Sequence, residues 1–184
     1  MFIGKGAIIV CGALLLAGTA SGQVPSGNVF VGYSYYNADL SSLGRSNLNG
    51  WNGSLEGKLL PWVGVVADIG GHFGSESVPF RCPGPGPCPN VSVNIHEYDF
   101  LFGPRVSVSV GKIRPFAEAL FGGGHLSTNG AGSDTSFATA LGGGIDYHLI
   151  PLLAWRLEGD YVQTRFFSAK QNNIRLSTGI VLRF

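Results

Sequence analysis

Two short clusters carry the residue types of a hydrolase. Each combines a histidine, a serine and a carboxylate within ten residues: His72, Ser75 and Glu76 in the first, and His125, Ser127 and Asp134 in the second. A histidine that takes a proton from a serine, and is itself oriented by a carboxylate, activates the serine as a nucleophile. Serine, aspartate and glutamate are also ordinary residues of polar links, so we expect no enzyme.

The remaining motifs indicate no cofactor, metal or nucleic-acid partner. The four histidines, His72, His96, His125 and His148, fall in four separate segments without the close spacing of metal ligands. No helix follows the glycine runs 122–124 and 142–144, so we interpret them as sites of close approach and curvature in a sheet rather than phosphate loops. The 12 basic residues nearly balance the 11 acidic residues and form no basic stripe.

A cysteine pair, Cys82 and Cys88, encloses the sequence Pro-Gly-Pro-Gly-Pro. In an exported protein such a pair should be oxidised, and this spacing fits neither a redox motif nor a metal motif. We therefore predict a structural disulfide between Cys82 and Cys88.

Residues 1–22 have the composition of a secretory signal. Lys5 supplies the positive charge, an apolar run follows from Ala7 to Gly18, and small residues at 20–22 form a cleavage site. The run is shorter than the roughly 20 apolar residues of a spanning helix. Cleavage after Gly22 would leave one domain, residues 23–184.

The residue pattern of the chain predicts β-strands, and it is clearest at the C-terminus. Apolar residues and one threonine occupy every second position from Ile174 to Phe184, and Arg175 and Arg183 lie among the residues between them. This period of two indicates a strand with one apolar and one polar face. In a barrel within lipid, leucine and phenylalanine would face the bilayer and arginine would face a polar lumen.

Eight segments of this kind follow one another along the chain: 28–38, 50–60, 63–74, 96–110, 114–126, 135–148, 154–167 and 173–184. The connections near Pro61, Gly111 and Pro151 are short, whereas longer loops are expected near 39–49, 75–94, 127–134 and 168–172. Because segment 75–94 carries five prolines, we predict no strand within it. Alternating short and long connections are typical of an outer-membrane barrel with both termini in the periplasm. The predicted fold is all-β, a closed eight-stranded antiparallel up-and-down transmembrane barrel.

The same alternation places most charged residues inside the predicted barrel. An eight-stranded barrel is just wide enough to be filled by its side chains, and buried charges must be paired. We predict a lumen charge network of twelve residues, with His72, His148 and Arg183 on the same faces: Glu56, Lys58, Asp68, Glu97, Asp99, Arg105, Glu118, Asp146, Arg156, Glu158, Asp160 and Arg175. We interpret this network as a structural plug, and the alternative is a narrow or gated pore for ions or small solutes.

The whole mature chain resembles the small bacterial outer-membrane barrels of the OmpA and OmpX type. The resemblance rests on strand number, loop rhythm, signal sequence and the terminal phenylalanine, and stretches 114–125 and 171–184 look like barrel domains of bacterial members. It implies that Ile180, Leu182 and Phe184 form the signal read by the barrel-assembly machinery. It also implies contact with outer-membrane lipid and lipopolysaccharide, and a structural or surface-interaction role in which the loops bind an extracellular ligand. Some membrane barrels are hydrolases or acyltransferases that place a histidine, a serine and a carboxylate near the outer rim, so a lipid-modifying enzyme is a further alternative.

Overall fold

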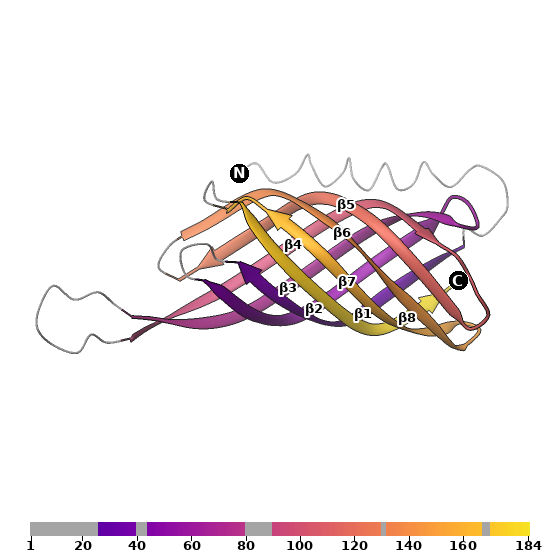
Figure 1. Ribbon diagram of the computed structural model, residues 1–184, viewed down its shortest axis with the longest axis horizontal. Helices are drawn as coiled ribbons and strands as arrows, with labels where there is room; N and C mark the ends of the chain where they lie inside the picture. Colours follow the sequence, from indigo (N-terminus) through magenta and orange to yellow (C-terminus); the bar gives the residue numbers. More distant parts are fainter. Residues whose placement is uncertain (1–25, 40–43, 80–89, 130–131, 167–169) are drawn as a thin grey trace, which may run out of the picture.

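Eight strands follow one another along the chain and lie side by side in a single curved sheet (Figure 1). The computed structural model describes residues 26–39, 44–79, 90–129, 132–166 and 170–184. The strands are β1 (Gly27–Asp39), β2 (Arg45–Lys58), β3 (Val63–Pro79), β4 (Asn90–Ser107), β5 (Ile113–Thr128), β6 (Gly132–Ile150), β7 (Leu153–Thr164) and β8 (Gln171–Arg183).

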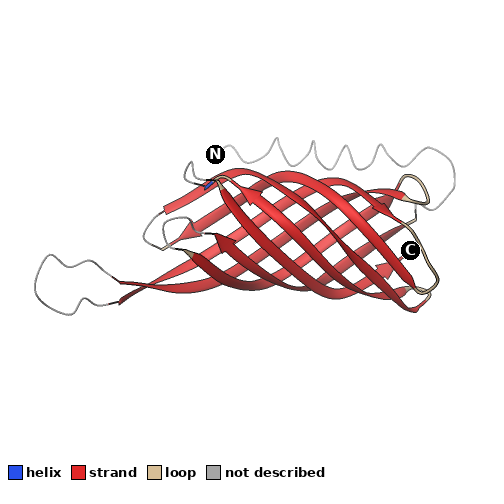
Figure 2. Cartoon of the chain, viewed as in Figure 1, coloured by secondary structure: helices blue, strands red, loops and turns tan. Residues whose placement is uncertain are grey.

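The sheet closes on itself because β1 pairs with β8 as well as with β2. Every neighbouring pair is antiparallel, and the Gly27 backbone N–H donates to the Phe184 carbonyl at 2.9 Å where the two ends of the barrel chain meet. The described residues are almost entirely strand, as Figure 2 shows. The prediction of a closed eight-stranded antiparallel barrel is confirmed.

Among the described residues there is no helix long and apolar enough to cross a membrane.

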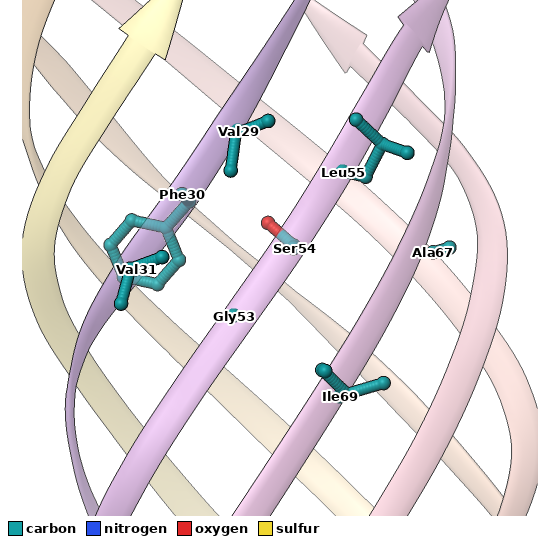
Figure 3. Close-up of a pocket in the computed structure, with 8 residues that line it drawn as sticks. All are labelled: Val29, Phe30, Val31, Gly53, Ser54, Leu55, Ala67 and Ile69. Atoms are coloured by element: carbon teal, nitrogen blue, oxygen red, sulfur yellow. The ribbon is translucent and has the colours of Figure 1, made fainter.

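Side chains alternate between the lumen and the outer surface along each strand, as the period of two predicts. On β1, Phe30 is buried in the lumen while Val31 is exposed, and on β2 Ser54 is buried while Leu55 is exposed (Figure 3). The outer positions around Gly53 leave a shallow apolar hollow of about 290 Å³ in the outer wall.

The outer surface is apolar along its middle and aromatic towards both ends. Exposed aliphatic and phenylalanine side chains come from every strand, among them Val31, Leu55, Phe100, Leu141 and Leu176. Aromatic rings frame this band at the end with the short turns (Trp62, Tyr147, Trp155 and Phe184) and at the end with the longer loops (Tyr35, Phe137 and Tyr161). At the loop end, the Tyr35 and Tyr161 hydroxyls each donate a hydrogen bond of 2.7 Å to an asparagine. An apolar band between aromatic girdles is the surface of a barrel in a bilayer.

The strands extend further towards the loop end than predicted. They are 12 to 19 residues long, against the roughly 9–11 residues that a tilted crossing needs. In particular, the prediction that segment 75–94 holds no strand is wrong, because Ser75–Pro79 pairs with Asn90–Asn94 and forms an arm beyond the rest of the barrel (Figure 1). Four of the five prolines fall between these two stretches, and Pro79 is the last residue of β3, where a missing N–H costs little.

The other predicted boundaries differ by a few residues. Strand β2 begins at Arg45, within the predicted loop 39–49, and β4 ends at Ser107 rather than Val110. The turn after β4 is closed by a pair of backbone hydrogen bonds between Val110 and Ile113, with Gly111 at a φ of 61° that favours glycine. The predicted signal sequence at 1–22 and the cysteine pair lie outside the described residues.

Candidate functional site

Three arginines in the middle of the lumen are buried almost completely. Arg105 projects from β4, Arg156 from β7 and Arg175 from β8, with exposed fractions of 0–1%. Burying a guanidinium costs several kcal/mol unless carboxylates and further hydrogen bonds surround it. The positions and partners of these arginines therefore define the site.

Arg105 is held mainly by two glutamates. Its Nε lies 2.5 Å from Glu118 Oε2, and its Nη2 lies 3.2 Å from Glu158 Oε2. The guanidinium carbon of Arg105 also lies 4.3 Å from the centre of the Phe116 ring, a cation–π contact. Strands β4, β5 and β7 are thereby connected across the lumen.

Arg156 forms a bidentate pair with Asp146 on the neighbouring strand. Arg156 Nε lies 2.7 Å from Asp146 Oδ1 and Nη2 lies 3.1 Å from Oδ2, the fork geometry that suits a carboxylate. Its Nη1 is 3.6 Å from Glu158 Oε2, so Arg105 and Arg156 share the same glutamate oxygen.

Arg175 gathers three aspartates from three different strands. Its Nη1 lies 2.7 Å from Asp68 Oδ1 and 3.1 Å from Asp99 Oδ2, and its Nε lies 2.9 Å from Asp160 Oδ2. Because β8 is remote from β3 and β4 in the sheet, these contacts cross the lumen rather than follow its wall.

A second set of polar side chains lies on the loop side of the arginines. The Tyr36 hydroxyl donates to Glu97 Oε1 at 2.9 Å and accepts from Asn173 Nδ2 at 2.9 Å. His72 stacks on Tyr36, with 4.6 Å between ring centres, and shares a 2.9 Å hydrogen bond with the Ser34 hydroxyl. Tyr36 thereby gives Glu97 a hydrogen bond, and Ser34 gives one to His72.

The turn end of the lumen carries further cationic side chains. Lys58 Nζ lies 3.4 Å from Glu56 Oε1, Arg183 Nη2 lies 3.3 Å from Asp146 Oδ2, and Arg114 Nη2 donates to the Ser107 hydroxyl at 2.6 Å. His148 lies against Arg183 at the same end.

Apolar side chains fill the lumen towards the loop end, which the sequence analysis did not predict. Leu48, Ile95, Leu126 and Phe166 are buried on the inner face and belong to one cluster. The apolar cluster is completed by Tyr36, Ala38, Val66, Leu101, Leu120, Ala138, Ala140 and Val162. These residues occupy the same alternating positions as the charged residues, so the period of two could have assigned them to the inner face.

Eleven of the twelve residues of the predicted lumen network are buried, and Lys58 is half-buried. The structure brings all of them except Glu97 into ion pairs, and Glu97 instead bonds to Tyr36. The alternation in the sequence did not draw attention to four buried polar residues of β1 and β8 that also face the lumen: Asn28, Ser34, Tyr36 and Ser177.

The structure divides the first hydrolase-like cluster between the two faces of β3. Ser75 is exposed on the outer face of β3, opposite to the face that carries His72 and Glu76, and Glu76 accepts a 2.7 Å hydrogen bond from Ser46. In the second cluster, His125 is exposed and shares a 2.7 Å hydrogen bond with Thr135. The four histidines are divided as well, since His72 and His148 face the lumen and His96 and His125 face outwards.

Glycines on the lumen face make room for the network. Side chains would otherwise occupy the space used by three carboxylates: a Cβ at Gly64 would lie 2.7 Å from Glu56 Oε1, a Cβ at Gly70 would lie 2.6 Å from Asp99 Oδ1, and a Cβ at Gly142 would overlap Asp160 Oδ1. Part of the glycine content predicted to relieve curvature therefore serves the packing of charged side chains.

Gly142→Ala is expected to destabilise the barrel by about 1–3 kcal/mol. The new methyl group would overlap Asp160 Oδ1 and would lie 2.5 Å from the backbone oxygen of Gly159, so both the carboxylate and the β7 backbone must shift. Gly53→Ala is the matched control on the outer wall, where the nearest atom to an added Cβ is 3.5 Å away, and its effect should stay within about 1 kcal/mol. Urea unfolding of both variants in lipid vesicles, followed by tryptophan fluorescence, measures the difference. Equal stability of the two variants would contradict the close packing at Gly142.

The lumen and the outer wall together define a class of fold, the small eight-stranded outer-membrane barrel, whose interior is filled by its own side chains. No family model matches the chain, and no curated protein matches its sequence. The resemblance to such barrels found in the sequence is confirmed at the level of the fold by solved structures.

Neisserial surface protein A is 14% identical, matches 86% of this chain and 97% of its own, and has a TM-score of 0.67. Ail, the attachment invasion locus protein of Yersinia pestis, is 18% identical, matches 88% of this chain and 100% of its own, and has a TM-score of 0.58. The N-terminal barrel domain of Pseudomonas aeruginosa OprF is 14% identical, matches 86% of this chain and 99% of its own, and has a TM-score of 0.50. At these identities the likeness establishes the fold and leaves the function to be argued from this chain.

Proposed function

We propose that this chain is an integral outer-membrane protein whose barrel is a closed anchor and whose loops form its interacting surface. The apolar outer band between two aromatic girdles supports insertion in a bilayer, since a soluble protein does not leave such a surface in water. The fold shared with Neisserial surface protein A and Ail supports the outer membrane as its location, with lipid and lipopolysaccharide around the wall. Both termini would then lie in the periplasm, where the barrel-assembly machinery would read Phe184 and the residues before it.

The observation that carries the proposal is the filled lumen. The arginines and their carboxylates occupy its middle, and the apolar cluster of Leu48, Ile95, Leu126 and Phe166 closes it towards the loops. An ion that crossed would have to displace paired charges and then pass an apolar layer, and both steps carry a high free-energy cost. We therefore assign the charge network a structural role rather than a conducting or catalytic one.

The arm formed by β3 and β4 supports a role for the loop end. It extends the paired backbone of Ser75–Pro79 and Asn90–Asn94 past the barrel (Figure 1). The Ail barrel has been solved in complex with a heparin analogue, sucrose octasulfate, which shows that a barrel of this fold binds a ligand other than lipid. The disulfide predicted between Cys82 and Cys88 would limit the conformations of the segment that joins β3 to β4.

Conductance in planar bilayers tests the closed anchor. The refolded protein, shown to be folded by its heat-dependent migration on a gel, is expected to give no steady channels. Channels whose conductance rises with salt concentration would contradict the proposal and favour the pore.

An epitope inserted after Asn129 should also be detected on intact cells, whereas one at Pro151 should require permeabilised cells. Detection in the reverse order would exclude the proposed orientation.

A further inference from the structure

Two hollows in the outer wall of β5, β6 and β7 adjoin and form one groove. The hollow near the middle of the wall has a volume of about 350 Å³, and Ala119, Phe121 and Leu141 belong to its lining. The hollow towards the loops has a volume of about 310 Å³. Thr139 of β6 and its partner Gln163 of β7 line both hollows, so the groove runs without a break from the apolar band towards the loop end.

Small side chains and a pair of hydrogen bonds keep this groove open. Ala119 and Thr139 contribute short side chains to its lining. On the β7 side, the Tyr161 hydroxyl and the Gln163 amide both donate to Asn172 Oδ1, at 2.7 and 3.3 Å. Asn172 is the partner of Gln163 on β8, the strand on the far side of β7 from β6. These two long side chains are therefore held away from Thr139 and leave the space over it unfilled.

The loop end of the groove carries two cations. Arg165 and Lys170 are exposed, and with Phe137 they line the hollow towards the loops. The last partners of β7 and β8 are Thr164 and Gln171, whose side chains are buried in the lumen, so the residue beyond each of them follows on the outer side. Neither cation takes part in the ion pairs found among the described residues.

The combination of groove and charge distinguishes this part of the wall. The hollow around Gly53 has a similar volume of about 290 Å³, but its lining, as far as the structure describes it, includes no charged side chain. Any acyl chain could cover an apolar hollow of that kind. A groove that ends on two cations instead suits an amphiphile with an acyl chain and an anionic head.

We infer that this groove binds one molecule of lipid A, the phosphorylated and acylated glycolipid of lipopolysaccharide. An acyl chain would lie beside Phe121 and Leu141, and a phosphate would lie against Arg165 and Lys170. Arginine and lysine are the usual partners of phosphate. A phosphate monoester such as that of lipid A carries a charge of about −1.5 to −2, which matches two cations better than the single charge of a phospholipid diester.

The choice of this lipid rests on the proposed function, which places the loop end in the outer leaflet. The proposed function requires only that lipid surrounds the wall, whereas the groove adds one defined site.

Lipid titration of the purified barrel tests the inference. The refolded barrel in detergent is titrated with diphosphoryl lipid A, and the lipid bound per chain is counted by native mass spectrometry. We expect one lipid A per chain and about fivefold weaker binding of phosphatidylglycerol, whose phosphate carries about one negative charge less. Equal binding of the two lipids, or no retained lipid A, would overturn the inference.

Removal of the cations tests the head of the site. Arg165→Gln combined with Lys170→Gln should weaken lipid A binding by about 25-fold, since each basic side chain near an anionic lipid contributes about fivefold. Arg45→Gln is the matched control, because Arg45 is exposed at the loop end of β2 and lies outside the lining of the groove. It should leave lipid A binding unchanged. An equal loss in the control would show that net charge alone retains the lipid.

Filling the groove tests its apolar part. Ala119→Leu should weaken lipid A binding by about fourfold, the contribution of one methylene group that the new side chain would displace. Ala67→Leu makes the same change in the hollow around Gly53 and should have no effect. Heat-dependent migration on a gel shows that each variant is folded. Equal binding by the two variants would contradict an acyl chain in the groove.

The binding measurement is separate from the tests of the proposed function. Because it is made in detergent, a failure to bind lipid A would leave the closed anchor and its orientation unaffected. Channels in planar bilayers would likewise leave the lipid site unaffected.

Discussion

Replacement of Arg175 by methionine is expected to lower the free energy of unfolding by about 3–5 kcal/mol. Methionine fills most of the volume of arginine, so the loss would come from charge rather than from a cavity. Asp68, Asp99 and Asp160, which lie 2.7, 3.1 and 2.9 Å from Arg175 nitrogens, would remain buried without their cation. Urea unfolding in lipid vesicles, followed by tryptophan fluorescence, gives the free energy directly.

Two further variants show whether the loss comes from unpaired charge. Arg45→Met removes an arginine at the start of β2 that is exposed and donates a hydrogen bond to Asn37, and its effect should stay within about 0.5 kcal/mol. Adding Asp68→Asn and Asp160→Asn to Arg175→Met should restore part of the stability, since fewer charges are then left unpaired. A large loss in Arg45→Met, or no recovery in the triple variant, would contradict this account.

Replacement of Phe166 by alanine is the second change for which we expect a large effect, a loss of about 3–5 kcal/mol. Phe166 is fully buried in the apolar cluster just beyond the end of β7. Its Cζ lies 3.0 Å from the position that a Cβ would take at Gly124, so the ring fills the space that this glycine leaves open. Alanine would leave a cavity that the rigid wall of the barrel cannot collapse to fill. The same unfolding measurement applies.

A size exchange with Gly124 makes this prediction specific. Gly124→Leu alone should destabilise the barrel through overlap with Phe166, whereas Gly124→Leu combined with Phe166→Ala should recover part of the loss. Phe137→Ala is the control on the outer wall, where the ring is 67% exposed, and it should cost much less than Phe166→Ala. Additive losses in the double variant would show that the two positions do not share one space.

The sequence predicted the fold and the inward face of the twelve network residues because both depend on the period of two. Glu118 and Arg175 alternate with apolar neighbours, and this alone assigns them to the lumen. It could not predict that Arg175 meets Asp68 and Asp99, because contacts across a barrel depend on strand register and tilt, which the alternation leaves open. The apolar cluster was missed for a separate reason. Leu48 lay in the predicted loop 39–49 and Ile95 just before the predicted strand 96–110, so neither was assigned to the inner face.

The prolines of segment 75–94 illustrate a different limit. The rule that proline interrupts strands was applied to the whole segment, although Ser75–Val78 and Val91–Asn94 hold none. Strand pairing continues up to Pro79 on one side and from Asn90 on the other. Proline interrupts a strand only at its own position, so the proline content of the whole twenty-residue segment did not show that its two ends can form strands.

The pairing of β1 with β8 has a consequence for the way the barrel is made. Gly27 and Phe184 are joined by a pair of backbone hydrogen bonds although nearly the whole described chain lies between them, so theirs is the contact of greatest sequence separation among the described residues. A chain released before β8 has been synthesised would leave one edge of β1 and one edge of β7 without backbone partners, a state that hydrocarbon does not tolerate. Closure therefore requires β8, and we expect the chain to remain outside the bilayer until this strand has been synthesised.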